Sequence, residues 1–257
     1  MNRPIREMFD RLPRVYELIN HIVSIGLDIS WRKRAAFLAA AKGGAIASLA
    51  AAKGEAIASV AVAKGGAAWL DVSTGTGEMA AYLRRLSGAG TTVVATDFSM
   101  PMLMEARRKE EARGIPFVMA DTGCLPFKAN SFDLVTISLA TRNITTSREN
   151  LISCLREFYR VLKPGGWFVN LETSQPNSLT VRRLFHKYVD GFLRPVGAAI
   201  SGSKSAYAYL SSTIRSFYGA DELTEIIKEA RFETVTVARL FLGMAAIHKA
   251  EKPQTRD

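Results

Sequence analysis

The stretch that decides the fold reads Leu70-Asp71-Val72-Ser73-Thr74-Gly75-Thr76-Gly77-Glu78. An apolar run precedes it and a helical run follows, so it predicts a tight loop between a strand and the start of a helix. Glycine at 75 and 77 lets the backbone pass close to a ligand, and free N–H groups at a helix start favour an anionic group. The loop alone also fits nucleotide-binding domains of another kind.

Asp71 narrows the choice of ligand. It stands four residues before the first glycine, at the strand end, where a carboxylate can receive a cationic amine. The spacing also departs from G-x-G-x-x-G, since residue 80 is Ala. Both features suit the amino-acid end of S-adenosylmethionine better than the pyrophosphate of a dinucleotide.

Polar side chains follow three more strand-like runs. Asp97 comes 20 residues after Gly77, where a carboxylate accepts both ribose hydroxyls. Capping of the next helix is its alternative role, although Ser99 suits that role better. Asp121 and Thr122 close the third run, where an acceptor can meet the adenine amino group, and Ser138 closes the fourth. Because the carboxyl ends of parallel strands share one edge of a sheet, these loops predict a class I methyltransferase fold.

The rest of the chain alternates between strand-like and helical runs, which favours an α/β fold with a parallel sheet covered on both faces. We expect a seven-stranded Rossmann-like sheet with a C-terminal antiparallel hairpin, N-terminal helices and a helical cap insert. The expected strands are 67–72, 92–96, 116–120, 132–138, 167–171, 234–238 and 240–247, and the expected helices are 78–86, 101–113, 147–162 and 220–230.

We expect a single domain over residues 1–257. Its parts are an N-terminal helical substrate cap (1–38), an Ala-rich repeat insertion (39–68), a cofactor-binding core (67–174), a helical cap insert (175–218), and a last helix with two strands (219–249). In the repeat, Lys42, Lys53 and Lys64 recur with a period of 11, which is three helical turns. We expect a helix weakened at each Lys-Gly pair. It is either a tolerated surface insertion or a helix that faces a partner or membrane.

Composition limits the partners. The net charge of +10 indicates a negatively charged partner such as nucleic acid, anionic lipid or an acidic ligand. Two cysteines cannot form a disulfide framework or a four-thiolate metal site, so we expect a reducing compartment and no metal. The N-terminus lacks a secretory pattern and no window suits a membrane span. We therefore expect a cytoplasmic protein that is soluble or peripheral at the inner face of the membrane.

Further motifs resemble one family. Arg160–Ser174 reads RVLKPGGWFVNLETS, and it is accompanied by Tyr16–Asn20 with Ser24 and Trp31–Lys33, by Leu125–Phe127, by Thr141–Thr145 and by Ala245–Lys249. Together these segments are similar to the quinone-biosynthesis C-methyltransferases, which act on demethylmenaquinol and on the polyprenyl-benzoquinol precursor of ubiquinone. Outside the repeat, the resemblance runs from about residue 5 to residue 249.

The resemblance implies methylation of the ring of a polyprenylated quinol, with demethylmenaquinol as the first choice of substrate. It places S-adenosylmethionine on Thr76, Asp97, Asp121, Thr122 and Ser138, to which the loop argument adds Asp71, Gly75 and Gly77. The alternatives are a benzoquinol precursor, another lipid or small molecule, and a non-catalytic cofactor-binding subunit. We expect no nucleic acid substrate, because the segment after the fourth strand lacks the Asn/Asp-Pro-Pro-aromatic stretch of base N-methyltransferases.

The resemblance also implies catalytic and substrate residues. Arg142 is expected at the quinol hydroxyl, where a permanently charged guanidinium stabilises phenolate. A surface role or a simple ion pair is its alternative. Asp28, His21 and Tyr16 are candidates for the proton path, and Asn20 and Asn143 for substrate contact. Relative to the family, an acid and an imidazole have exchanged places at 21 and 28, so their chemistry survives if they face each other. Solvent exposure of His21 and helix capping by Asp28 are the alternatives.

The helical insert is strongly basic. Between residues 175 and 218, six Lys and Arg residues face one acid, Asp190, and aromatic residues lie between them. Such a segment suits an anionic membrane surface, where a polyprenyl substrate resides, although an ordinary solvated face has the same composition. The sequence leaves open whether the chain is a homodimer.

Overall fold

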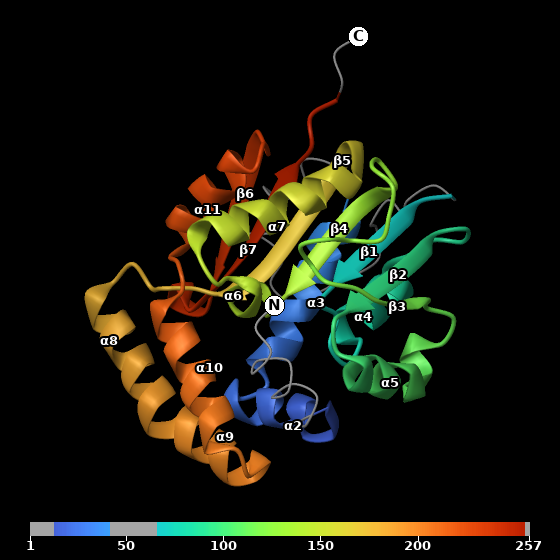
Figure 1. The fold of residues 1–257 in the computed structure, drawn as a ribbon. Helices are drawn as coiled ribbons and strands as arrows, with labels where there is room; N and C mark the ends of the chain where they lie inside the picture. Colours follow the sequence, from blue (N-terminus) through green and yellow to red (C-terminus); the bar gives the residue numbers. More distant parts are fainter. Residues whose placement is uncertain (1–12, 42–65, 255–257) are drawn as a thin grey trace.

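The computed structural model describes residues 13–41 and 66–254 of the chain (Figure 1). The Ala-rich repeat, with its predicted weak helix, is expected over residues 39–68, and its central part, 42–65, lies outside the described residues. Its described ends belong to the core: residues 39 and 40 close the helix Leu27–Ala40, and residue 68 opens the strand Ala68–Val72. None of the helices within the described ranges is long and apolar enough to span a membrane.

A seven-stranded sheet forms the centre of the molecule, in the order β3-β2-β1-β4-β5-β7-β6. The first five strands are parallel, and β7 runs antiparallel to both of its neighbours. The expected Rossmann-like sheet and C-terminal hairpin are confirmed, with the last strand inserted between the fifth and sixth. The strands are β1 Ala68–Val72, β2 Thr92–Asp97, β3 Phe117–Met119, β4 Phe132–Ser138, β5 Leu162–Thr173, β6 Thr234–Leu240 and β7 Ala245–Glu251.

Helices cover both faces of this sheet. On one face α3 (Leu27–Ala40), α4 (Glu78–Leu86) and α5 (Met100–Arg108) supply one apolar cluster, and on the other α7 (Arg148–Val161) and α11 (Ala220–Glu229) supply a second. Side chains fix where two of them begin, because Ser99 caps α5 and Ser147 caps α7. The result is the three-layer arrangement that strand–helix alternation predicts.

Three expected segments differ from the structure. The 240–247 strand is wrong at its start: residues Phe241–Gly243 form a short 3-10 turn, η3, and β7 begins only at Ala245. Phe241, Leu242 and Gly243 all have positive φ, which breaks a strand. The 101–113 helix ends at Arg108 and is followed by a separate turn, η1 (Glu110–Ala112). The fifth strand begins at Leu162, earlier than expected, and it contains an irregular segment before Trp167, where Gly165 has a φ of 72° and the register with β4 shifts.

A helical cap stands at the carboxyl end of the parallel strands (Figure 1). It consists of α8 (Leu179–Tyr188), a π-helical turn η2 (Val189–Leu193), α9 (Arg194–Ser201) and α10 (Lys204–Ser216), and α2 (Pro13–Val23) packs against it. Ile19 of α2 joins Phe185, Val189 and Tyr207 in an apolar cluster separate from the two sheet faces. Helix α2 and the insert therefore form one layer at the sheet edge, whereas α3, part of which was expected in the N-terminal substrate cap, covers a face of the sheet.

A buried lysine holds the end of α3. Lys249 of β7 is 4% exposed, and its Nζ donates to the carbonyls of Leu38 (3.0 Å) and Ala41 (2.7 Å). The same ammonium lies 4.4 Å from the ring centroid of Trp167. Burial lowers the pKa of Lys249 to about 8. A cation at the carbonyl end of a helix stabilises that end, so Lys249 fixes the point where the chain leaves α3.

Candidate active site

The loop after β1 has the backbone that its glycines predict. Gly75 and Gly77 have φ of 57° and 82°, and a Cβ on Gly77 would lie 3.0 Å from the Cβ of Ala106. Gly77 starts α4, whose first N–H groups point out of the helix. A positive φ together with this close approach disfavours any residue with a Cβ at 77. The loop is thus a backbone cradle beside a helix N-terminus, as the cofactor prediction requires.

Asp71 lies under this loop rather than at its surface. Its carboxylate is fully buried and accepts hydrogen bonds from the hydroxyls of Thr74 (2.6 Å) and Thr136 (2.7 Å). Burial raises the pKa of Asp71 to about 6, although both hydroxyls oppose the shift. The observed role is therefore to order the loop, and reception of a cofactor amine by Asp71 stays a prediction.

Asp97 ties the second strand to the same loop. Its carboxylate accepts the N–H of Gly75 at 2.9 Å and that of Ser99 at 2.9 Å. Ser99 caps the following helix, so Asp97 is not the cap residue. The carboxylate thus lies against the backbone cradle, at the end of β2.

The third strand leads to a small cavity. Asp121 and Thr122 line it together with Phe98 and Ile144, and its volume is about 140 Å³. Thr122 also lies 3.2 Å from Ser73, Oγ to Oγ, which joins this cavity to the β1 loop. An aromatic and an aliphatic side chain beside a carboxylate suit a flat heterocycle with an exocyclic amine. Ser138, the last residue of β4, leads into Leu139, which lines a second, larger cavity.

The larger cavity has a volume of about 340 Å³ and lies between the cap, the N-terminal helices and the sheet edge. Most of its lining is apolar, including Trp31 of α3, Phe185 and Tyr188 of α8, and Met244 before β7. The polar side chains that reach it are few. They belong to Asn20, Ser24, Asp28, Arg142 and Thr173.

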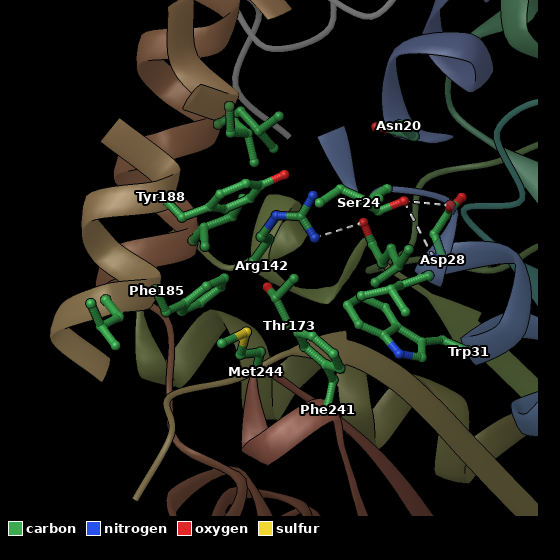
Figure 2. Close-up of a pocket in the computed structure, with 17 residues that line it drawn as sticks. Asn20, Ser24, Asp28, Trp31, Arg142, Thr173, Phe185, Tyr188, Phe241 and Met244 are labelled. Carbon is green, nitrogen blue, oxygen red and sulfur yellow. Dashed lines mark hydrogen bonds between the residues drawn. The ribbon is translucent and has the colours of Figure 1, made fainter. Parts of the chain in front are cut away.

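Arg142 is the central cation of this cavity. It belongs to the short helix α6 (Thr141–Ile144), is 6% exposed, and projects between Tyr188 and Ser24 in Figure 2. Its Nη1 binds the buried carboxylate of Glu172 and donates to the carbonyl of Leu139 at 3.0 Å. The buried Nε has no hydrogen-bond partner among the described residues. The guanidinium is therefore fixed on one side and keeps an unpaired donor.

Asp28 and His21 face each other, as the exchange of acid and imidazole requires. His21 Nδ1 lies 2.8 Å from Asp28 Oδ2, and the Ser24 hydroxyl donates to Asp28 Oδ1 at 2.6 Å. Arg32 Nη1 donates to the same carboxylate at 2.5 Å. Burial would raise the pKa of Asp28, but the hydrogen bond from Ser24 and the charges of Arg32 and His21 hold it below its ordinary value. Asp28 is therefore a stable carboxylate and a weak base.

The same charges join the cavity to the β1 loop. Arg32 Nη1 lies 2.9 Å from Glu78, the first residue of α4, and His21 Nε2 lies 3.5 Å from it. Glu17 binds Lys109, and the Thr76 hydroxyl lies 3.5 Å from Glu17. Glu17, His21 and Glu78 are close enough to hold a metal ion, but Arg32 and Lys109 already supply cations to their carboxylates.

The remaining predicted residues lie at several places. Asn20 lines the larger cavity, whereas neither His21 nor Asn143 does. Asn143 is buried in α6, and its Oδ1 has no hydrogen-bond partner in the described part of the chain. Tyr16 lies on α2, with its side chain outside the described residues.

The sequence did not assign several residues that the structure brings to the site. Glu172, Trp31 and Arg32 all belong to motifs that carry the family resemblance, but the sequence analysis gave none of them a function. Only the fold shows that Glu172 reaches Arg142 across 30 residues. Phe241 had no usable signal, because its apolar run indicated a strand.

Comparisons with known proteins agree with this architecture. A demethylmenaquinone methyltransferase of Thermus thermophilus is 35% identical over 248 residues, which cover 96% of this chain and 100% of that one. A ubiquinone/menaquinone biosynthesis C-methyltransferase of Pseudomonas putida is 31% identical, over 98% of this chain and 90% of its own.

Solved structures show the same fold at lower identity. A SAM-dependent methyltransferase of Thermotoga maritima superposes with a TM-score of 0.57 and 17% identity, covering 96% of this chain and 99% of that one. A SAM-dependent methyltransferase of Aquifex aeolicus superposes with a TM-score of 0.50 and 18% identity, covering 74% of this chain and 84% of that one. The model of the ubiE/COQ5 methyltransferase family matches residues 1–252, and the chain therefore belongs to that family.

Proposed function

We propose that this protein transfers a methyl group from S-adenosylmethionine to a ring carbon of a polyprenylated quinol, with demethylmenaquinol as the first substrate. The observation that carries the proposal is the larger cavity. It is mostly apolar, has a size suited to a small ring system, and is lined by the buried guanidinium of Arg142, whose Nε has no hydrogen-bond partner among the described residues. Relatives are named for the demethylmenaquinone reaction or for both ubiquinone and menaquinone biosynthesis, so a benzoquinol precursor is the second candidate.

The residues at the sheet edge fit the cofactor. The Gly75–Gly77 cradle, where a Cβ at 77 would crowd Ala106, would take the methionine end, with Thr76, Ser138 and Asp71 around it. Asp97 would accept the ribose hydroxyls, and Asp121 with Thr122 would meet the adenine in the smaller cavity. S-adenosylmethionine supplies an electrophilic methyl group on its sulfonium.

Arg142 would stabilise the reacting quinol. Loss of a phenolic proton makes the ring carbon nucleophilic, and the guanidinium of Arg142, which lines the cavity, can stabilise the resulting oxyanion. Glu172 fixes the guanidinium, so the donor needs no reorganisation when the charge develops. Arg142 stays protonated and is therefore not the base.

The proton path would run along the N-terminal helices. Asp28 lines the cavity and touches His21, which in turn approaches Glu78. With its low pKa, Asp28 serves better as an orienting carboxylate for the His21 imidazole than as the final acceptor. Asn20 and Tyr16 would contact the substrate, and Asn143 would support the loop that carries Arg142.

The test is methyl transfer from labelled S-adenosylmethionine to a panel of reduced, demethylated quinones, with the products identified by mass. We expect one methyl group on a ring carbon, with the fastest turnover on demethylmenaquinol. Binding of the cofactor without transfer to any quinol would contradict the proposal and favour a non-catalytic subunit. Faster turnover on a benzoquinol would reassign the substrate.

We also propose that the enzyme works in the cytoplasm and meets its substrate at an anionic membrane surface. The basic cap of residues 175–218 is the support for this. Whether a homodimer forms stays a prediction, which light scattering after gel filtration tests.

A further inference from the structure

The mouth of the larger cavity carries large apolar side chains in solvent. Ile25, Leu184 and Phe241 all line the cavity, yet 73%, 60% and 53% of these residues are exposed. They come from the turn after α2, from α8 and from η3. Leu242, next to Phe241, does not line the cavity and is 72% exposed. We call these four residues the mouth.

The mouth is unusual in its backbone as well as its exposure. Ile25, Phe241 and Leu242 have φ of 55°, 43° and 58°, a conformation that residues with a Cβ rarely adopt. The fold thus holds bulky apolar side chains outward in a strained backbone. Contiguous exposed apolar residues of this kind mark surfaces that meet another apolar phase.

An apolar stripe continues from the mouth along α2. Leu18 and Ile22 are 55% and 38% exposed, and they precede Ile25 by seven and three residues. Leu18 and Ile22 are four residues apart and therefore share one side of α2, which ends at Val23, two residues before Ile25.

Unpaired cations lie beside the mouth. Arg183 and Lys187 flank Leu184 on α8, one turn apart, and both are exposed with no carboxylate partner among the described residues. The only acid between residues 175 and 218 is Asp190, and it is paired with Arg215 at 2.8 Å. The charge around the mouth is therefore complementary to an anionic surface.

We propose that the mouth is a membrane-docking surface for anionic lipid, resting on the proposed function. The apolar tips insert among the acyl chains, and Arg183 and Lys187 meet the headgroups. A cavity of about 340 Å³ is at the low end of small-ligand pockets, so it holds a ring and not a long chain. The prenyl tail then stays in the bilayer while the ring reaches Arg142.

The first test is co-sedimentation of the full chain with phosphatidylcholine vesicles, with and without phosphatidylglycerol. We expect binding that requires the anionic lipid. Arg183→Gln/Lys187→Gln should weaken it on the order of 30-fold, since each basic residue near the surface contributes about one factor of five. The matched control is Arg113→Gln/Lys128→Gln, an exposed pair outside the cap, which should bind as wild type does.

The second test separates docking from chemistry. Leu242→Asn introduces a residue that tolerates a positive φ, at a position that does not line the cavity. It should retain wild-type turnover on a soluble short-tailed quinol but show a raised KM for a long-chain quinol in vesicles. The control is Met104→Gln, which also replaces an exposed apolar side chain by a polar one, at a residue of α5 that is 53% exposed. It should change neither the turnover on the soluble quinol nor the KM for the long-chain quinol.

Three results would overturn the proposal: equal binding to neutral and anionic vesicles, wild-type vesicle binding by Arg183→Gln/Lys187→Gln together with a wild-type KM of Leu242→Asn for the long-chain quinol, or a dimer in solution that Leu242→Asn converts to monomer. Lipid-dependent binding that needs these residues, without methylation of any quinol, would support docking while refuting the proposed reaction.

Discussion

The glycine loop and the larger cavity lie at the same sheet edge but satisfy their polar groups differently. Around the loop, the carboxylate of Asp71 accepts from the hydroxyls of Thr74 and Thr136, and that of Asp97 accepts from backbone N–H groups. In the cavity, Arg142 depends on Glu172 from a distant strand and keeps an unpaired donor. In the first region the buried carboxylates are hydrogen-bonded to the protein itself, whereas in the second a buried donor is left without a partner among the described residues. We therefore expect loop changes to act on cofactor affinity and cavity changes to act on turnover.

The largest effect should come from Arg142→Ala. Loss of the preorganised donor should lower kcat by about 10²–10³ while the Kd for S-adenosylmethionine stays near the wild-type value. Initial-rate assays with demethylmenaquinol measure kcat, and calorimetric titration measures the Kd for the cofactor. Arg142→Lys, which keeps the charge but not the planar fork, should recover only part of the rate. Near-wild-type turnover of Arg142→Ala would remove this residue from the mechanism.

Gly77→Ala should weaken cofactor binding by the glycine loop. The left-handed backbone costs a residue with a Cβ about 1–2 kcal/mol, and here the Cβ also meets Ala106. We expect the Kd for the cofactor to rise by about tenfold or more, with the quinol cavity intact. Gly114→Ala is the matched control, since it has the same φ of 82° with open space around it. If both variants bind the cofactor equally well, the cradle is not a binding element.

Asp71→Asn should separate stability from binding. The pKa of Asp71 is raised, so its stabilising contribution is present below about 3.8 and is lost as pH rises through about 6. At pH 8 the neutral amide should unfold with about 1–3 kcal/mol more stability than the wild type, and this difference should vanish near pH 4. Urea unfolding at both pH values measures it. Weaker cofactor binding in the same variant would support the amine role, and unchanged binding would leave Asp71 as a loop anchor alone.

The smallest effect should come from Lys109→Met, which removes the ion pair between Lys109, the residue that joins α5 to η1, and Glu17 of α2. Partly exposed pairs contribute about 1 kcal/mol or less, so we expect a rise of a few fold in the KM for quinol. Arg108→Met is the neighbouring control, because Arg108 pairs with Glu105 within α5. Equal effects of the two substitutions would argue against coupling between the regions.

The two regions also differ in how far the sequence predicts them. The β1 loop, Asp97 and Asp121 follow from spacing, because each stands directly after a strand whose end the sheet fixes. The Glu172–Arg142 pair could not be predicted, since its partners meet only when β5 lies beside β4. The sequence wrongly predicted a strand at Phe241 and Leu242, and this error also has a physical cause. An apolar run normally signals burial, whereas here the chain exposes it at the cavity mouth.

The hydrogen bonds from Lys249 to the carbonyls of Leu38 and Ala41 have a consequence for the evolution of the repeat. On the far side of the repeat, Gly66 donates to the carbonyl of Gly90 at 3.1 Å, and Ala67 accepts from Thr92. Both ends of the interval are thus anchored on the sheet, independently of what joins them. Gain or loss of a whole 11-residue unit by replication slippage should therefore leave methyl transfer unchanged. Deletion of residues 50–60 measures this directly, and a loss of activity would show that copy number is under selection.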